Sequence, residues 1–310
     1  MSDITVTVVC TAYNHEKYLA QCLESLVSQK TAFAYEIIVH DDASTDRTAD
    51  IIQEYAEKYP DLIRPIFQTE NQYSKNVLIY RTFVYPVVRG KYIAICEGDD
   101  FWTDPMKLQR QVDALEAHPE IDMCVHASAI VRDGKTAGLI SPAKTERIFD
   151  PGEMIAGGGG MIMTNSIMYR KSMRDHLPRF IEFLEYDYSL QIWGSLRGGV
   201  LYLPEVMSAY RELSDGSWSS KMRKFPATRI KHLERVERMM LILKEEIDPK
   251  YIPSIDVKIL NLRFTILEEQ GNYRAMLKPE FRPVIKQFSW KRKIKLLVKW
   301  MISPFRGSMS

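Results

Sequence analysis

Apolar and polar positions along the first hundred residues fall into blocks that predict strands and helices in alternation. Short apolar runs with the length and composition of buried strands cover residues 4–11, 35–40, 62–67 and 92–96. Between these runs, apolar side chains recur at the spacing of one helix face in residues 16–29, 48–59 and 77–88. This alternation is typical of a sheet covered by helices, so we predict an α/β fold with a mostly parallel, Rossmann-like sheet.

Polar clusters follow three of the predicted strands. They occupy residues 11–15, 41–46 and 97–100, each at the carboxyl end of an apolar run. In open α/β sheets, ligands bind outside the carboxyl ends of the strands. We therefore expect the three clusters to meet at one edge of the sheet and to form the binding site there.

The third cluster places Glu97, Asp99 and Asp100 around Gly98. An unpaired charge is costly to bury, and glycine lets the backbone turn and approach a neighbour closely. One interpretation is a site for Mg²⁺ or Mn²⁺, which proteins hold with one or two carboxylates together with substrate phosphates. The other interpretation is a polar turn whose acids cap the helix that starts near Pro105. The residues alone leave both interpretations open.

The regular alternation ends after residue 102. We predict a helix over residues 105–117, a strand over residues 123–131 and a hairpin turn at Asp133–Gly134. A glycine run at residues 157–160 lacks the Lys and the Ser or Thr of a P-loop, and it lacks the spacing of a dinucleotide fingerprint. The two interpretations of this run are a phosphate-binding loop and a flexible loop beside the active site, and we favour the flexible loop.

Asp187 is the first residue of a predicted helix over residues 187–193. An acid in this position either caps the helix or serves as a general base at the mouth of the site. Residues 212–220 form a polar segment around Trp218, which we interpret as a lid-like loop.

The composition changes near residue 220, and we predict a boundary between a domain of residues 1–220 and a helical region of residues 221–310. The last 30 residues contain eight Lys or Arg and no acid. On a helix, Trp290, Ile294, Leu297 and Met301 share one face. Such a basic amphipathic helix binds an anionic membrane surface or packs on the domain with its charges solvated, and we favour the membrane.

Length, net charge and cysteine content limit the classes of protein to which this chain can belong. The chain of 310 residues suits one large domain or one domain with an appendage, and a net charge of +2 argues against a nucleic-acid partner. The four cysteines have no zinc-ligand spacing, which favours buried free thiols in a reducing compartment. The N-terminus lacks the layout of a signal peptide, and no apolar stretch reaches the ~20 residues of a membrane span. We therefore expect a cytoplasmic protein, peripheral at the inner face of the cell membrane.

Three motifs together resemble the family 2 glycosyltransferases of the GT-A fold, especially bacterial enzymes of cell-surface polysaccharide synthesis. The motifs are Thr-Val-Val-Cys-Thr-Ala-Tyr-Asn14, Asp-Asp-Ala-Ser-Thr-Asp46 and Glu-Gly-Asp-Asp-Phe-Trp102. The resemblance covers about residues 4 to 220. It implies inverting, metal-dependent transfer of a sugar from a nucleoside-diphosphate-sugar donor to a hydroxyl of a lipid-linked oligosaccharide or polysaccharide acceptor.

The resemblance also implies roles for individual residues. Thr11 and Asp42 would contact the nucleotide base, Asp99 would lie by the ribose or the metal, and Asp100 would ligate Mn²⁺ or Mg²⁺. Asp187 would be the general base, with Glu185 as its nearby rival. Three further residues are expected to bind substrate, with Arg211 on the diphosphate: Tyr13, Arg211 and Trp218.

Two departures from the family pattern limit these expectations. Many relatives carry a metal-suited histidine in the loop after a Tyr-Arg pair, where this chain has Leu213 after Tyr210-Arg211. A third metal ligand from the protein is therefore in doubt. The Gln-x-x-Arg-Trp motif of processive synthases is absent, so we expect one sugar per catalytic event.

Two alternative functions remain open from the sequence. A sugar nucleotidyltransferase would carry a glycine-rich, basic phosphate loop near the N-terminus, but residues 8–20 contain no glycine and only Lys17 as a basic residue other than His15. A non-catalytic, sugar-nucleotide-binding scaffold module would keep the fold without the chemistry. Asp99, Asp100 and Asp187 argue against it.

Overall fold

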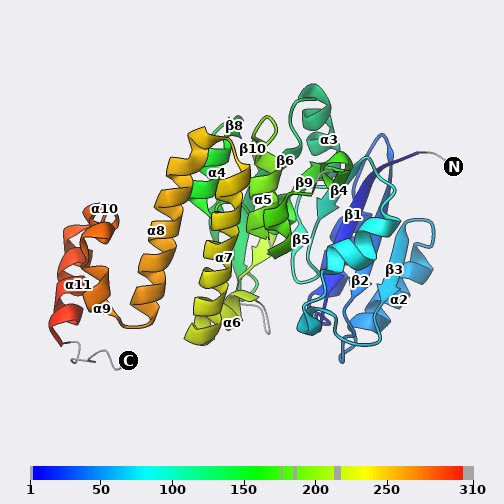
Figure 1. Cartoon of the computed structure of the whole chain (residues 1–310). Coiled ribbons are helices and arrows are strands. Elements are labelled where there is room, and N and C mark those ends of the chain that lie inside the picture. The colour runs from blue at the N-terminus through cyan, green and yellow to red at the C-terminus, as the bar shows by residue number, and fades with distance from the viewer. Residues whose placement is uncertain (1–2, 176, 184–186, 213–217, 303–310) are drawn as a thin grey trace.

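The computed structural model describes residues 3–175, 177–183, 187–212 and 218–302. These residues form one ten-stranded mixed sheet flanked by helices, followed by a helical C-terminal region (Figure 1). The strand order is β3-β2-β1-β4-β9-β6-β10-β5, with β7 paired to β6 and β8 paired to β10. The predicted α/β class is confirmed.

The N-terminal half of the sheet is parallel. Its strands are β1 (Ile4–Ala12), β2 (Ala34–Asp41), β3 (Ile63–Phe67) and β4 (Tyr92–Ile95), which pair in parallel with β1 between β2 and β4. Alternate residues of β1 belong to different buried clusters, Val9 to one and Val8 and Cys10 to the other. Because both faces are covered, the strands read as continuous apolar runs, as the sequence predicted. The covering helices in this half are α1 (Leu19–Val27) and α2 (Thr48–Lys58).

The segment predicted to be helical over residues 77–88 is helical in part, but it is not a regular α-helix. The segment forms a π-helical turn, η2 (Tyr80–Val84), followed by a 3-10 turn, η3 (Tyr85–Val87). Pro86 lies within η3 and has no backbone N–H to donate, so a regular α-helix cannot run through it. The apolar spacing was sound, since Val84 is fully buried, but the backbone could not follow it.

The C-terminal half of the sheet mixes strand directions. β6 (Met123–Arg132) and β10 (Val200–Arg211) pair in parallel, while β9 (Met168–Arg170) is antiparallel to both β4 and β6. The remaining strands are short additions at its margins: β5 (Phe101–Trp102), β7 (Lys135–Ile140) and β8 (Arg147–Phe149). β6 and β7 form the predicted hairpin, in which Asp133 and Gly134 have φ of 48° and 73°, as a type I′ turn requires.

Helices cover this half and continue away from it. They are α3 (Lys107–Ala117), α4 (Pro151–Gly157), α5 (Asp187–Ser195), α6 (Trp218–Lys224), α7 (Pro226–Glu246) and α8 (Ile252–Glu269). Met240 of α7 and Ile255 of α8 share a buried cluster with Val125 of β6, so the apolar core runs across residue 220. The boundary near residue 220 stays a prediction.

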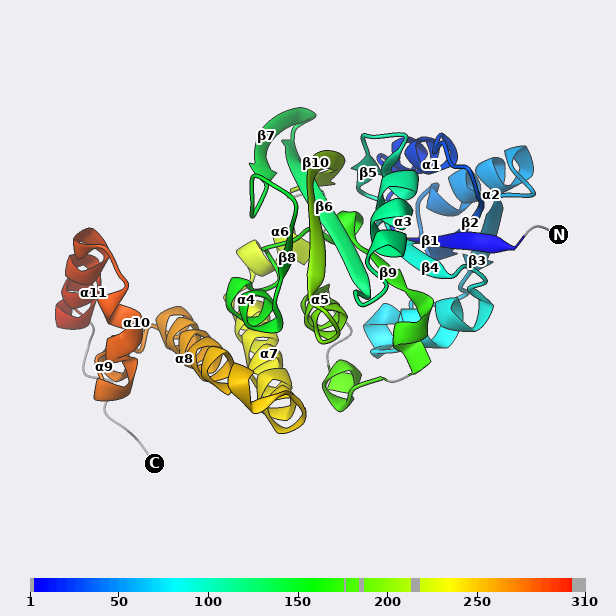
Figure 2. The ribbon, with the colours of Figure 1, turned by 90° about the horizontal axis from the view of Figure 1, so that it is seen from above.

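The last helices form a small core of their own. α9 (Tyr273–Met276), α10 (Arg282–Lys286) and α11 (Trp290–Ile302) pack with the end of α8 through Phe264, Met276 and Leu296. Figures 1 and 2 both show this group at the opposite end of the molecule from the N-terminus. Within the part of the chain that the structure describes, no helix is long and apolar enough to cross a bilayer.

Gly90, which precedes β4, lies so close to Thr7 of β1 that a larger residue there is expected to lower stability. A Cβ on Gly90 would lie 2.4 Å from the backbone nitrogen of Thr7, whereas a Cβ on Gly138 in β7 would meet nothing closer than 3.7 Å. We expect Gly90→Ala to lower the free energy of unfolding by roughly 1–3 kcal/mol, because backbone must move. Gly138→Ala is the matched control and should change it by less than about 0.5 kcal/mol. Urea unfolding measures both, and equal effects would contradict the packing described here.

Candidate active site

The polar clusters after β1, β2 and β4 meet at one edge of the sheet, as the sequence predicted. The backbone N–H of Gly98 donates to the carbonyl of Thr11 over 2.9 Å, and that of Asp42 donates to the carbonyl of Ala12 over 3.0 Å. A Cβ on Gly98 would lie 2.9 Å from Nδ1 of His15, so glycine is needed for this close approach. Tyr13 follows β1 and is 41% exposed at the same edge.

Asp42 fixes a neighbouring loop at this edge. Its buried carboxylate accepts hydrogen bonds from the backbone N–H groups of Gln72, over 2.8 Å, and Tyr73, over 3.1 Å. The adjacent Asp41 instead binds Ser44 within its own turn. Asp42 therefore shapes the wall that borders Thr11, and a contact between its carboxylate and a nucleotide base stays a prediction.

Asp100 is the most enclosed acid of the edge. It is 1% exposed, and its two carboxylate oxygens accept from Nδ2 of Asn165 and from the backbone N–H of Arg211, each over 2.8 Å. Burial and the neighbouring Asp99 charge raise its pKa well above the ordinary value, although both hydrogen bonds act in the opposite direction. A buried carboxylate beside a second carboxylate is an arrangement that a cation stabilises, so these residues fit Mg²⁺ or Mn²⁺.

The protein supplies few ligands to such a cation. Among the described residues, no group of three or more His, Cys, Asp or Glu side chains is arranged to hold a metal ion. Asp99 and Asp100 would thus need oxygens from a substrate to complete the coordination shell, as is usual for Mg²⁺. Leu213, where many relatives have histidine, lies outside the described residues.

Arg211 occupies a different setting from the one expected. Its guanidinium donates to the backbone carbonyl of Asp99 and to Oε1 of Gln21, and it lies 4.5 Å from the ring centroid of Phe101 and 5.1 Å from that of Tyr18. These contacts hold the end of β10 against α1 and β5. Contact between Arg211 and a diphosphate stays a prediction.

Asp187 starts α5, as predicted, and its carboxylate reaches toward the acids of the edge. Asp187 is exposed to solvent as a residue, and desolvation by nearby protein atoms raises the pKa of its carboxyl. Burial raises the pKa of Glu97 well above its ordinary value, and the charges of Asp187, Asp99 and Asp100 raise it further, so Asp187 lies near these acids. Four carboxylates from two distant parts of the chain therefore converge. Glu185 lies outside the described residues, and of Trp218 only its place at the start of α6 is described.

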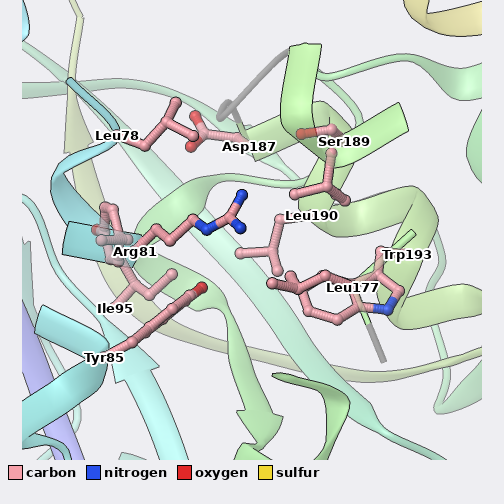
Figure 3. A pocket seen from close by; sticks show the side chains of 11 residues that line it. Leu78, Arg81, Tyr85, Ile95, Leu177, Asp187, Ser189, Leu190 and Trp193 are labelled. Atoms are coloured by element: carbon pink, nitrogen blue, oxygen red, sulfur yellow. The ribbon is translucent and has the colours of Figure 1, made fainter. Parts of the chain in front are cut away.

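A pocket adjoins Asp187 on the side of α5. Its wall is mostly apolar, and the Arg81 side chain extends across it in Figure 3, with Asp187 at one end. Leu78, just before η2, lines it together with residues of η2, η3, β4 and α5, among them Tyr85, Ile95, Leu190 and Trp193. An apolar pocket with a carboxylate at its mouth can hold a molecule whose hydroxyl faces that carboxylate.

The glycine run leads directly into the site. α4 ends at Gly157, and Nε2 of Gln191 in α5 donates to the carbonyls of Gly159, over 3.4 Å, and Ile162, over 3.1 Å. The chain then enters η4 (Thr164–Ser166), where Thr164 hydrogen-bonds Asp187 and Asn165 hydrogen-bonds Asp100. The sequence reasoning missed this turn, although three polar residues inside the apolar segment 161–170 were a visible signal.

The cysteines are as expected. Four thiols are free and buried: Cys10, Cys22, Cys96 and Cys124.

Comparison with known proteins places this geometry in a family. The profile of Glycosyl transferase family 2 matches residues 7–177. An uncharacterised protein of Mycobacterium tuberculosis is 37% identical over 231 residues, which span 72% of this chain and 64% of that relative.

Two solved structures share the fold. S. aureus TarS (residues 1–349), solved with UDP-GlcNAc, has a TM-score of 0.63 and 15% identity, with 96% of this chain and 79% of TarS covered. The mannosyltransferase PcManGT of Pyrobaculum calidifontis, solved with GDP-Man and Mn²⁺, has a TM-score of 0.54 and 14% identity, covering 97% of this chain and 89% of PcManGT. With the profile match over more than half of its length, the chain belongs to glycosyl transferase family 2.

Proposed function

We propose that this chain is an inverting, metal-dependent glycosyltransferase that moves one sugar from a nucleoside-diphosphate-sugar to a hydroxyl of a lipid-linked oligosaccharide or polysaccharide. The observation that carries the proposal is the convergence of Asp187 with Glu97, Asp99 and Asp100 between the nucleotide-side edge and an apolar pocket. Family membership and the donors bound by TarS and PcManGT support a nucleotide-sugar.

The donor side is the edge formed by β1, β2 and β4. Thr11, Tyr13 and Asp42 would receive the nucleoside, and Asp99 and Asp100 would hold Mg²⁺ or Mn²⁺ against the diphosphate. When bound, the cation offsets the negative charge that develops on the diphosphate leaving group. Arg211 adds a fixed positive charge behind Asp99, because its guanidinium is held on the Asp99 carbonyl.

The acceptor side is the pocket next to Asp187. An acceptor hydroxyl must lose its proton as it attacks the anomeric carbon, and a carboxylate with a raised pKa is a better proton acceptor than an ordinary aspartate. Burial raises the pKa of Asp187, while its hydrogen bond with Thr164 favours the ionised form that a base needs. The apolar wall with Tyr85 and Trp193 would exclude water from the attacking hydroxyl.

A substitution of Asp187 tests whether the chain is a transferase or a non-catalytic scaffold. We expect Asp187→Asn to lower the turnover rate by roughly 10²- to 10⁴-fold, because the amide cannot take the proton, while nucleotide binding remains. The measurement is release of nucleoside diphosphate in the presence of acceptor, with nucleotide binding followed separately. Asp50→Asn, which changes a first-turn acid of α2, is the matched control for a loss of helix capping. Full activity of Asp187→Asn would contradict the assignment, and nucleotide binding by a wild-type chain without turnover would favour the scaffold.

A substitution of Glu97 tests whether a cation offsets the repulsion among the four carboxylates. Its pKa in the folded chain lies above the ordinary 4.5, so ionising it costs the folded state stability as the pH rises above that value. Glu97→Gln lacks this cost. In the presence of a chelator, we expect the variant to exceed the wild type in free energy of unfolding by an amount that grows as the pH rises above about 4.5. Adding Mn²⁺ should shrink the gap, and urea unfolding that shows a pH-independent gap would contradict the charge cluster.

The C-terminal helix supports attachment to a membrane surface. In α11, Trp290 is 67%, Met301 65% and Ile302 74% exposed, and Ile294 and Leu297 are also exposed on the same helix. Arg292, Lys295 and Lys299 add positive charge to it. Exposed apolar side chains on a basic helix suit insertion at the boundary of an anionic leaflet, where a lipid-linked acceptor resides.

The attachment is testable by vesicle co-sedimentation. We expect the double variant Trp290→Ser/Met301→Ser to bind vesicles containing phosphatidylglycerol at least roughly tenfold less than the wild type, because two apolar side chains that would insert into the leaflet are lost. Leu241→Ser/Val257→Ser removes exposed apolar groups from α7 and α8 and is the control that should leave binding unchanged. Equal binding by all three proteins would refute the role of α11.

A further inference from the structure

Asn165 is a fully buried polar residue in η4 that connects the sheet to the acid most enclosed at the edge. Its Nδ2 donates to Oδ2 of Asp100 over 2.8 Å. Its Oδ1 accepts from Oγ of Ser208 in β10 over 2.7 Å, and Oγ of Ser128 in β6 lies 3.3 Å from it. The two serine hydroxyls are 2.8 Å apart and hydrogen-bond each other. A chain of hydrogen bonds thus runs from two central strands to Asp100.

The chemistry of these groups fixes the direction of the amide. A carboxylate that binds a metal is ionised and can only accept hydrogen bonds, so the NH₂ end of Asn165 faces Asp100 when a cation is bound. The opposite end then accepts the hydroxyl proton of Ser208, which in turn accepts from Ser128, in a site with no access to water. Turning the amide over would point its oxygen at the carboxylate of Asp100 and its NH₂ at Ser208, so both hydrogen bonds would be lost.

The backbone of η4 is held independently of the Asn165 side chain. Nε1 of Trp102 donates to the carbonyl of Asn165 over 3.0 Å. Nε2 of Gln111 in α3 donates to the carbonyl of Ser166 over 2.8 Å and to that of Cys124 over 3.0 Å. The turn that presents Asn165 is therefore braced from β5 and α3, by contacts that do not touch Asp100.

We propose that Asn165 is a positioning residue that fixes the carboxylate of Asp100 for a divalent cation. The inference rests on the proposed metal-dependent function. Asn165 holds one oxygen of Asp100 and the Arg211 backbone N–H holds the other, so the plane of the carboxylate is set from two sides. Each oxygen keeps a further lone pair. Residues that hydrogen-bond a metal ligand without touching the metal orient that ligand. Their mutation commonly weakens metal binding by 10- to 100-fold.

The experiment measures Mn²⁺ binding by electron paramagnetic resonance on the full chain with UDP, GDP, CDP or dTDP present in turn and no acceptor, because a diphosphate completes the coordination shell. Asn165→Leu keeps the volume and removes both ends of the amide. We expect it to weaken Mn²⁺ binding by roughly 10- to 100-fold, against abolition in Asp100→Asn. Gln111→Leu is the matched control, because it removes buried hydrogen bonds to the same turn but none to Asp100. It should unfold at lower urea concentration than the wild type and bind Mn²⁺ within about twofold of it.

Wild-type affinity in Asn165→Leu would overturn the proposal. Equal losses in Asn165→Leu and Gln111→Leu would also overturn it, because general loosening of the turn would then be the cause. If Asn165→Leu does not fold, Ser128→Ala/Ser208→Ala releases the amide instead, and unchanged Mn²⁺ affinity in that variant would refute the proposal. A wild-type chain that binds no Mn²⁺ with any of the four nucleotides refutes both this inference and the metal site, whereas absence of sugar transfer with Mn²⁺ binding intact bears on the proposed function alone.

Discussion

The central constraint on the structure is that it holds several acidic side chains close together and partly shielded from water. Glu97, Asp99, Asp100 and Asp187 approach one another at the carboxyl edge of the sheet, and burial and mutual repulsion raise the pKa values of Glu97 and Asp100. A fold with no use for these groups would gain stability by losing them. Their presence indicates that the edge is shaped for a positively charged or proton-donating partner.

The surrounding elements hold this charge in place. The parallel strands β1, β2 and β4 deliver their loops to one edge, and short backbone hydrogen bonds join those loops. β10 brings the Arg211 N–H to Asp100 from the opposite half of the sheet, and η4 brings Asn165 and Thr164. The helices α7 and α8 lie over the same core, so the helical region is physically continuous with the sheet that carries the acids.

Local pattern was enough to predict the acids but not their partners. Asp42, Asp99 and Asp100 follow apolar runs whose carboxyl ends must share an edge in a parallel sheet, and Asp187 heads a periodic segment, so their positions followed from strand and helix boundaries. Asn165 contacts Asp100 across 65 residues and Arg211 contacts it across 111, and no periodicity encodes such distances. Residues 77–88 depart from a regular α-helix for another reason, since Pro86 interrupts a pattern that is otherwise helical.

The central claim is that the acidic edge binds a nucleoside diphosphate together with a divalent cation. Its most direct test is a thermal-unfolding screen of UDP, GDP, CDP and dTDP, each with and without Mn²⁺, because a ligand that binds only the folded chain raises its unfolding temperature. We predict that one nucleotide raises the unfolding temperature strongly with Mn²⁺ and weakly without it, and that Asp100→Asn abolishes the difference. No shift with any nucleotide in the presence of Mn²⁺ would contradict the account.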